Sequence, residues 1–153
     1  MDHMIILQAF VGIIIMKQYK SKYSLIPGTS YDEVVVVARR EYKKIVNLTK
    51  RQPYVRSTYF NKDKIFVAIF WEHLSQKHRK ERMKRLKFYN AAIDLLRNSR
   101  CEPDTIFKSN NLSTLLHRFY GVSKEGKEYC VQVKQNKRSG RKDFMSVFDR
   151  KSL

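Results

Sequence analysis

The sequence predicts an α+β fold in which N-terminal helices pack on a C-terminal antiparallel sheet of three to four strands. Apolar residues recur at helical spacing over much of the chain before Pro103. Short segments rich in β-branched and aromatic residues follow it. Helices first and strands last is the order expected of an α+β domain. With 153 residues and 42% hydrophobic side chains, the chain can form one domain with a sizeable core.

The first predicted helix covers about Tyr31–Thr49. Ser30 and Glu33 have the spacing of a capping box and follow a Pro-Gly break. The run of four valines at 34–37 favours a strand instead, because β-branched side chains are stiff in helices. The cap and the longer period make the helix the better interpretation. The residues expected on its core face are Val34, Val37, Ala38, Ile45 and Leu48.

A second predicted helix is long, amphipathic and strongly cationic, and covers residues 77–98. Few carboxylates stand at the i,i+4 spacing that would pair its cations, so phosphate contact is favoured over a merely solvated face. Its cations are Lys77, Arg79, Lys80, Arg82, Lys84, Arg85 and Lys87. Before it, RQPYVRSTYF reads as a link around Pro53, and KIFVAIFWEHL fits either a helix or a short strand.

Three predicted strands close the chain. They are LSTLLHRFYGV, KEYCVQVKQ and KDFMSVF, and they are separated by the turn-like segments SKEG and NKRSGR. Tyr129, Val131 and Val133 alternate with polar residues, as in a half-buried strand. The three segments therefore predict an antiparallel meander packed against the helices.

Charge is the outstanding feature of the composition. The chain has 32 Lys and Arg against 14 Asp and Glu, a net charge of +18. A polyanion relieves the self-repulsion of such a body, and the interleaved aromatics favour nucleic acid over membranes or acidic proteins. Cys101 and Cys130 cannot form a framework of disulfides and lack metal-ligand spacing, which indicates a reducing compartment, the cytoplasm.

The apolar stretch Met4–Met16 stands apart from the rest, and we treat residues 1–16 as an extension of the single domain at 17–153. It is shorter than the about 20 residues that cross a bilayer, and no Lys or Arg precedes it as in a signal peptide. It is a buried strand or helix, a weak membrane anchor, or non-native sequence upstream of a start at Met16. The first and third are favoured, so we expect no stable membrane insertion.

Candidate catalytic groups lie in the C-terminal strands. No nucleotide-binding loop, zinc-finger spacing or HExxH motif occurs, so we expect neither a cofactor nor a metal. RNA offers a reaction without them, because its 2′-hydroxyl can attack the adjacent phosphate when a base, an acid and cations are supplied. His117, Arg118, Lys134 and Ser146 provide that set. Cations of the last hairpin add phosphate contacts at Lys137, Arg138, Arg141 and Lys142.

Structural roles compete with these assignments. Taken alone, His117 is more often a hydrogen-bonded structural histidine, and Ser146 between two phenylalanines is more often a buried hydroxyl. His73 lies on an apolar helix face and reads as structural, whereas His78 lies among cations and reads as a surface residue. The alternation leaves open whether His117 or Arg118 faces Lys134.

Three strings carry a family resemblance: YVRSTYFNKDKIFVAIFWEHL, RMKRLKFYNAAIDLLRNS and LLHRFYG…GKEYCVQVKQNKRSGRKDFMSVF. Over about Tyr54–Phe148 the chain resembles small proteins of prophages and mobile elements, similar to the phage-associated branch of the barnase, EndoU, colicin and RelE-like (BECR) nuclease group. The resemblance implies metal-independent ribonuclease chemistry on a compact α+β fold. Its polar signature falls on His117, Arg118, Lys134 and Ser146, and Lys142 and His73 match it less closely.

The function predicted from the sequence is a metal-independent endoribonuclease, a toxin or effector of a mobile element. An acidic antitoxin or immunity protein is then an expected partner, because complementary charge speeds capture. The alternative is a regulator that binds RNA or DNA through the cationic helix and hairpin without cleaving. A third interpretation, a membrane-associated basic protein, rests on the apolar stretch and the basic residues after it.

Overall fold

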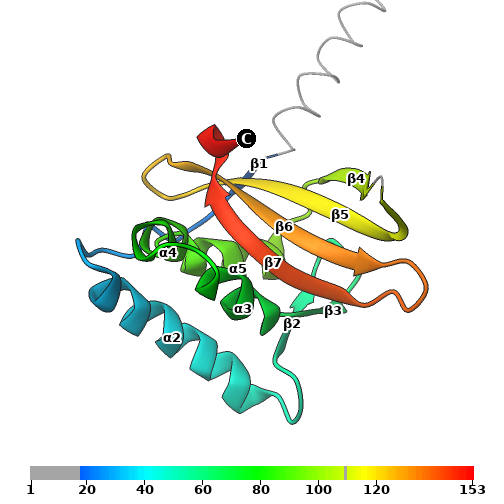
Figure 1. The fold of residues 1–153 in the computed structure, drawn as a ribbon, viewed down its shortest axis with the longest axis horizontal. Helices are drawn as coiled ribbons and strands as arrows, with labels where there is room; N and C mark the ends of the chain where they lie inside the picture. The colour runs from blue at the N-terminus through cyan, green and yellow to red at the C-terminus, as the bar shows by residue number, and fades with distance from the viewer. Residues whose placement is uncertain (1–17, 109) are drawn as a thin grey trace, which may run out of the picture.

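The computed structural model describes residues 18–108 and 110–153, and the extension at 1–16 lies outside them. The helices are α2 (Tyr31–Leu48), α3 (Ile69–Ser75), α4 (Arg79–Leu86) and α5 (Tyr89–Asn98), with a final 3₁₀ turn η1 (Arg150–Ser152). The strands are β1 (Gln18–Lys20), β2 (Tyr54–Ser57), β3 (Asp63–Phe66), β4 (Asp104–Lys108), β5 (Asn111–Val122), β6 (Glu128–Asn136) and β7 (Lys142–Asp149). Figure 1 shows the helices on one side of a curled sheet, with α2 outermost.

The fold is α+β, as predicted, but the prediction of a three- to four-stranded antiparallel sheet was wrong. The described residues form one seven-stranded sheet in the order β1-β5-β6-β7-β3-β2, with β4 also paired to β5. β5, β6 and β7 form the predicted antiparallel meander. β1 runs parallel to β5, and β3 runs parallel to β7, so the sheet is mixed. The four additional strands are only three to five residues long, too short to display an alternating pattern.

α2 forms where the sequence predicts a helix, despite its run of valines. The Ser30 hydroxyl accepts a hydrogen bond from the Glu33 amide at 3.3 Å and donates one to the Glu33 carboxylate at 3.1 Å. This cap satisfies an amide that the first turn leaves without a partner. Val34 and Ala38 are fully buried, whereas Leu48 is 82% exposed, so the buried stripe ends before the helix does.

The long cationic helix predicted at 77–98 is divided into α4 and α5. The break falls at Lys87 and Phe88, where the Ile26 amide donates to the Lys87 carbonyl at 2.9 Å. α5 is buried against the sheet along most of its length, while α4 lies beside β7. Within residues 18–108 and 110–153, no helix is long and apolar enough to cross a bilayer.

The ambiguous segment at 64–74 contains both predicted structures. Its first residues belong to β3, and α3 begins three residues after that strand ends. Phe70 of α3 stacks on Phe144 of β7 with ring centroids 4.6 Å apart, which holds the helix against the sheet. The next turn of α3 therefore lies over the middle of β7.

Candidate active site

The predicted catalytic residues lie on opposite faces of the sheet. Arg118 pairs with Gln132, and Gln132 pairs with Ser146, so these three side chains share one face across β5, β6 and β7. Lys134, two residues beyond Gln132, belongs to the same face. His117 pairs with Val133 on the other, helix-covered face. The structure therefore brings Arg118, Lys134 and Ser146 to one face and separates His117 from them.

A β-bulge in β7 turns Ser146 away from the core. The β6–β7 register shifts between Gln132 and Val133, so that Ser146 opposes Gln132 while Phe144 opposes Val133. Met145 is the extra residue. Phe144 is fully buried, whereas the Ser146 hydroxyl, only partly buried, donates to the Gln132 side-chain oxygen at 3.2 Å.

A pocket of about 230 Å³ opens between α3, α4 and the β6–β7 pair. It combines one imidazole, two cations and two neutral hydrogen-bonding side chains with an apolar surround. Its lining residues are Phe70, His73, Leu74, Lys77, Arg85, Gln132, Met145, Ser146 and Phe148. We call this hollow the His73 pocket.

The cationic side of the His73 pocket comes from α3, α4 and the link between them. His73 lies half-buried in the last turn of α3, and Lys77 follows four residues later. Arg85 is held by two contacts. Its Nε lies 3.1 Å from the Glu81 carboxylate, and its guanidinium carbon lies 5.5 Å from the centre of the Phe148 ring. A guanidinium fixed in this way retains donors for a bound anion.

Arg118 continues the polar row beyond Gln132. It faces Gln132 on one side and Asp104 of β4 on the other. Its Nε atom is buried and has no hydrogen-bond partner in the described part of the chain. An orphaned buried donor is costly, so Arg118 carries an unsatisfied group within the fold.

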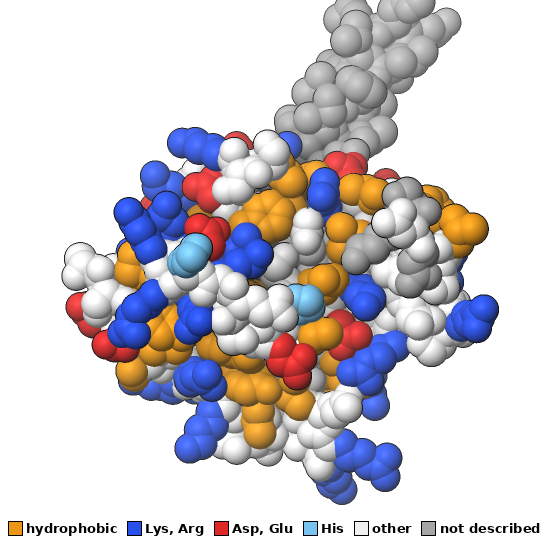
Figure 2. All heavy atoms as spheres, viewed as in Figure 1, with side chains coloured by type: hydrophobic (Ala, Val, Ile, Leu, Met, Phe, Trp, Pro, Cys, Tyr) orange, Lys and Arg blue, Asp and Glu red, His pale blue; other side chains and the backbone are white. Residues whose placement is uncertain are grey.

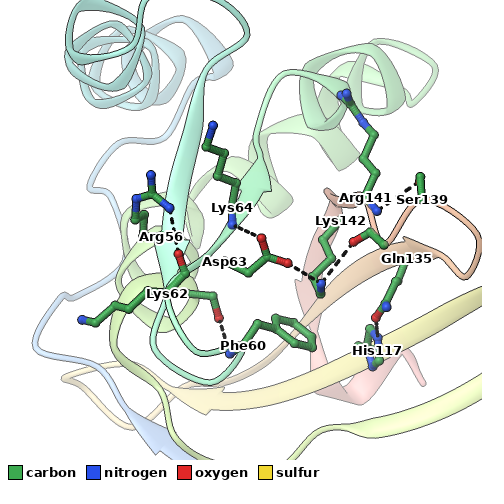
Figure 3. A network of polar contacts seen from close by, with 12 residues as sticks. Arg56, Phe60, Lys62, Asp63, Lys64, His117, Gln135, Ser139, Arg141 and Lys142 are labelled. Atoms are coloured by element: carbon green, nitrogen blue, oxygen red, sulfur yellow. Dashed lines mark hydrogen bonds and ion pairs between the residues drawn. The ribbon is translucent and has the colours of Figure 1, made fainter.

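His117 belongs to a separate, buried network on the helix-covered face. Only 6% of it is exposed, with Nδ1 2.8 Å from the Thr105 hydroxyl and Nε2 2.7 Å from the Gln135 side-chain oxygen. Because an amide oxygen only accepts, Nε2 carries the proton and Nδ1 accepts from Thr105. Both ring nitrogens are thus engaged within the protein. Figure 3 shows the contact between His117 and Gln135 beside Phe60 and Lys142.

Lys142 is also committed within the fold. Its Nζ lies 2.6 Å from an Asp63 carboxylate oxygen and 3.1 Å from the Gly140 carbonyl, and it is only 7% exposed. The Lys142 ammonium holds the pKa of Asp63 below its usual value, chiefly through this hydrogen bond. Lys142 therefore joins β7 to β3, and the surface contact predicted for it is not available in this conformation.

We predict that His117 makes folding stability depend on pH. Burial lowers its pKa below the ordinary 6.5, the Gln135 hydrogen bond opposes this, and the Lys142 charge adds to it. The unfolded chain therefore binds a proton at higher pH than the folded chain. The contribution of neutral His117 to the free energy of unfolding is complete above the unfolded pKa of about 6.5. It is lost as the pH falls through the lower pKa that His117 has in the folded protein. Denaturant titrations at about pH 7.5 and at about pH 5 would measure the loss, and His117→Gln should flatten it. An equal slope in the variant would contradict this assignment.

The eleven predicted phosphate-binding cations fall into three groups. Arg85 and Lys77 line the pocket. Four others are held by carboxylates or carbonyls of the fold, namely Arg79, Arg82, Arg141 and Lys142. The remaining five have no ion-pair partner in the described residues, namely Lys80, Lys84, Lys87, Lys137 and Arg138. Figure 2 shows Lys and Arg side chains around the margin of one face, with fewer acidic ones among them.

His73 and Gln132 line the pocket but were not among the predicted site residues, although the family resemblance extends less closely to His73. The residues near His73 in the sequence are apolar, which indicated a structural role for it. In the structure these apolar residues form the pocket wall beside His73. Lys77 follows His73 by four residues, but α3 ends at Ser75, so helical spacing could not have paired the two. No signal reveals Gln132 either, since its partnership with Ser146 depends on the bulge.

Among residues 18–108 and 110–153, no three His, Cys, Asp or Glu side chains gather in a group that could hold a metal ion. Comparison of the chain with protein-family models, with curated proteins and with solved structures finds no match.

Proposed function

We propose that this protein is an endoribonuclease that binds and cleaves RNA at the His73 pocket without a metal. The observation that carries the proposal is the meeting of His73, Lys77 and Arg85 with Ser146 and Gln132 around one open hollow. Histidine is the side chain best suited to proton transfer near neutral pH. Cations and neutral donors are the groups that stabilise a phosphate as its charge grows.

The reaction follows from the positions of these groups. His73 accepts the proton of a 2′-hydroxyl, and the 2′-oxygen attacks the adjacent phosphorus. The bond from phosphorus to the 5′-oxygen breaks, which leaves a 2′,3′-cyclic phosphate and a 5′-hydroxyl. Lys77 supplies the proton that the leaving oxygen takes up, and Arg85 stabilises the phosphorane charge. Ser146 and Gln132 orient the phosphate oxygens.

A second candidate function is RNA or DNA binding without cleavage. The observation that favours it is that the described residues supply the His73 pocket with a single imidazole, while His117 is engaged on the other face. The proton for the leaving 5′-oxygen then has to come from Lys77. A regulator of this kind would bind nucleic acid in a salt-dependent manner and leave it intact.

The proposal carries two expectations for the cell. A ribonuclease of this kind would harm its host, so an acidic antitoxin or immunity protein is the expected partner. Action on RNA and two unpaired cysteines, Cys101 and Cys130, are consistent with the cytoplasm. A pull-down from the native host that returned RNA and no acidic protein would count against the partner.

The chemistry is tested by incubating the purified protein with labelled single-stranded RNA in excess chelator. We expect cleavage products that end in 2′,3′-cyclic phosphates and 5′-hydroxyls. The matched control is the same oligonucleotide with a 2′-deoxy sugar at the cleaved position, which should remain intact. RNA that is bound but not cut, or deoxy substrate cut equally well, would exclude this reaction and leave the binding function.

A further inference from the structure

A second hollow adjoins the His73 pocket along α4. Its volume is about 410 Å³. Arg85 and Phe148 line both hollows, so the two share a wall formed by that pair. The wall consists of the Arg85 guanidinium beside the Phe148 ring. A flexible chain bound in one hollow can therefore continue directly into the other.

The second hollow carries an excess of positive charge. Its lysines come from α4, the β5–β6 turn and η1, namely Lys84, Lys87, Lys127 and Lys151. No ion pair within the described residues involves any of them. Both carboxylates of the lining are already bonded. Glu81 pairs with Arg85, and Asp149 accepts the Lys151 amide at 2.9 Å. The uncompensated charge favours an extended polyanion.

We propose that the two hollows form one groove for single-stranded RNA, with the nucleotides next to the cleaved bond bound in the second hollow. This inference rests on the proposed function of the His73 pocket. A hollow of about 410 Å³ suits a unit the size of a nucleotide. Arg85 lies between the hollows and would contact the phosphate that joins the two parts of the strand. The enzyme then acts on longer single strands better than on dinucleotides or duplexes.

The test is a double variant, Lys127→Ala with Lys151→Ala, which removes cations that line only the second hollow. The probes are single-stranded 2′-O-methyl RNAs that cannot be cleaved, a dinucleotide and an oligonucleotide of about eight nucleotides. We expect the affinity for the longer probe to fall about tenfold. The slope of log affinity against log salt should become shallower by about 1.4, since each lost phosphate contact on a single strand removes about 0.7.

The matched control is Lys43→Ala with Lys50→Ala, which removes the same charge from exposed positions in and just after α2. Figure 1 places α2 on the opposite side of the molecule from η1. We expect this variant to bind the longer probe within about twofold of the parent protein. Dinucleotide binding should fall less than binding of the longer probe in the Lys127/Lys151 variant, because a dinucleotide reaches fewer of these cations, and it should match the parent protein in the Lys43/Lys50 variant.

The outcomes separate the groove from the proposed reaction. An unaltered affinity and salt slope in the Lys127/Lys151 variant, or equal losses in the two variants, would overturn the groove even if RNA is cleaved. A duplex of the same length that competes as well as the single strand would overturn the substrate class. Failure of the parent protein to cleave any RNA would reject the reaction, whereas the length-dependent loss would still support the groove.

Discussion

Replacing His73 with alanine should lower the rate of RNA cleavage at saturating RNA by about a hundredfold or more. The imidazole lines the pocket together with Lys77 and Ser146, and no other histidine of the described residues does so. Its loss removes the base that activates the 2′-hydroxyl, while the cations that hold the phosphate stay in place. The affinity for RNA should therefore change little, about threefold at most. Single-turnover cleavage with a binding isotherm measures both quantities.

His78→Ala is the matched control for this prediction. His78 is exposed at the start of α4, close in sequence to His73 but outside the lining of the pocket. We expect its cleavage rate to stay within about twofold of the parent protein. If both variants cleave at the parent rate, proton transfer does not involve this pocket.

Asp94 is a buried carboxylate of α5 that fixes the start of the sheet. It is 3% exposed and accepts hydrogen bonds from the Ser21 hydroxyl at 2.8 Å, the Tyr19 hydroxyl at 3.0 Å and the Lys22 amide at 3.4 Å. Asn98 donates to its other oxygen at 2.9 Å. Burial, reinforced by the charge of Asp94, raises the pKa of Tyr19 to about 12. The carboxylate therefore ties the segment of β1 to α5.

Asp94→Ala should destabilise the fold by about 3 kcal/mol, because it leaves several part-buried donors without an acceptor. That is a large share of the about 5 to 15 kcal/mol that typically stabilises a domain. Denaturant unfolding measures the difference. Asp32→Ala is the control, since it breaks an exposed ion pair with Arg79 and should cost less than about 1 kcal/mol. Equal costs in the two variants would show that the Asp94 contacts do not stabilise β1.

Local sequence signals predicted the long elements of this fold and failed for the short ones. The cap at Ser30 identified the start of α2, and alternation around Val131 identified β6. β1 and β3 are stabilised by parallel pairing with distant strands, so three or four residues carry no period of their own. The break between α4 and α5 involves a hydrogen bond from Ile26, a contact that helical spacing cannot reveal.

The candidate site was predictable in composition but not in geometry. The sequence placed Arg118 on the first and Ser146 on the third strand of one meander, and they do share a face with Gln132 of the middle strand between them. The face of His117 could not be read from a strand that is apolar on both sides. The bulge at Met145 also had no signal, although it decides that Ser146 points away from Phe144. Pairing register, set by contacts between distant segments, decides which polar groups meet.

The central claim is that RNA is cleaved at the His73 pocket and not at the buried His117 network. The most direct measurement is a side-by-side cleavage assay of His73→Ala and His117→Gln at about pH 7.5, where both proteins are first shown by denaturant unfolding to be folded. We predict that His73→Ala loses cleavage by about a hundredfold or more, while His117→Gln retains it. Cleavage that survives in His73→Ala and disappears in folded His117→Gln would contradict the assignment of the reaction to the His73 pocket. It would place the site at the His117 network on the other face of the sheet.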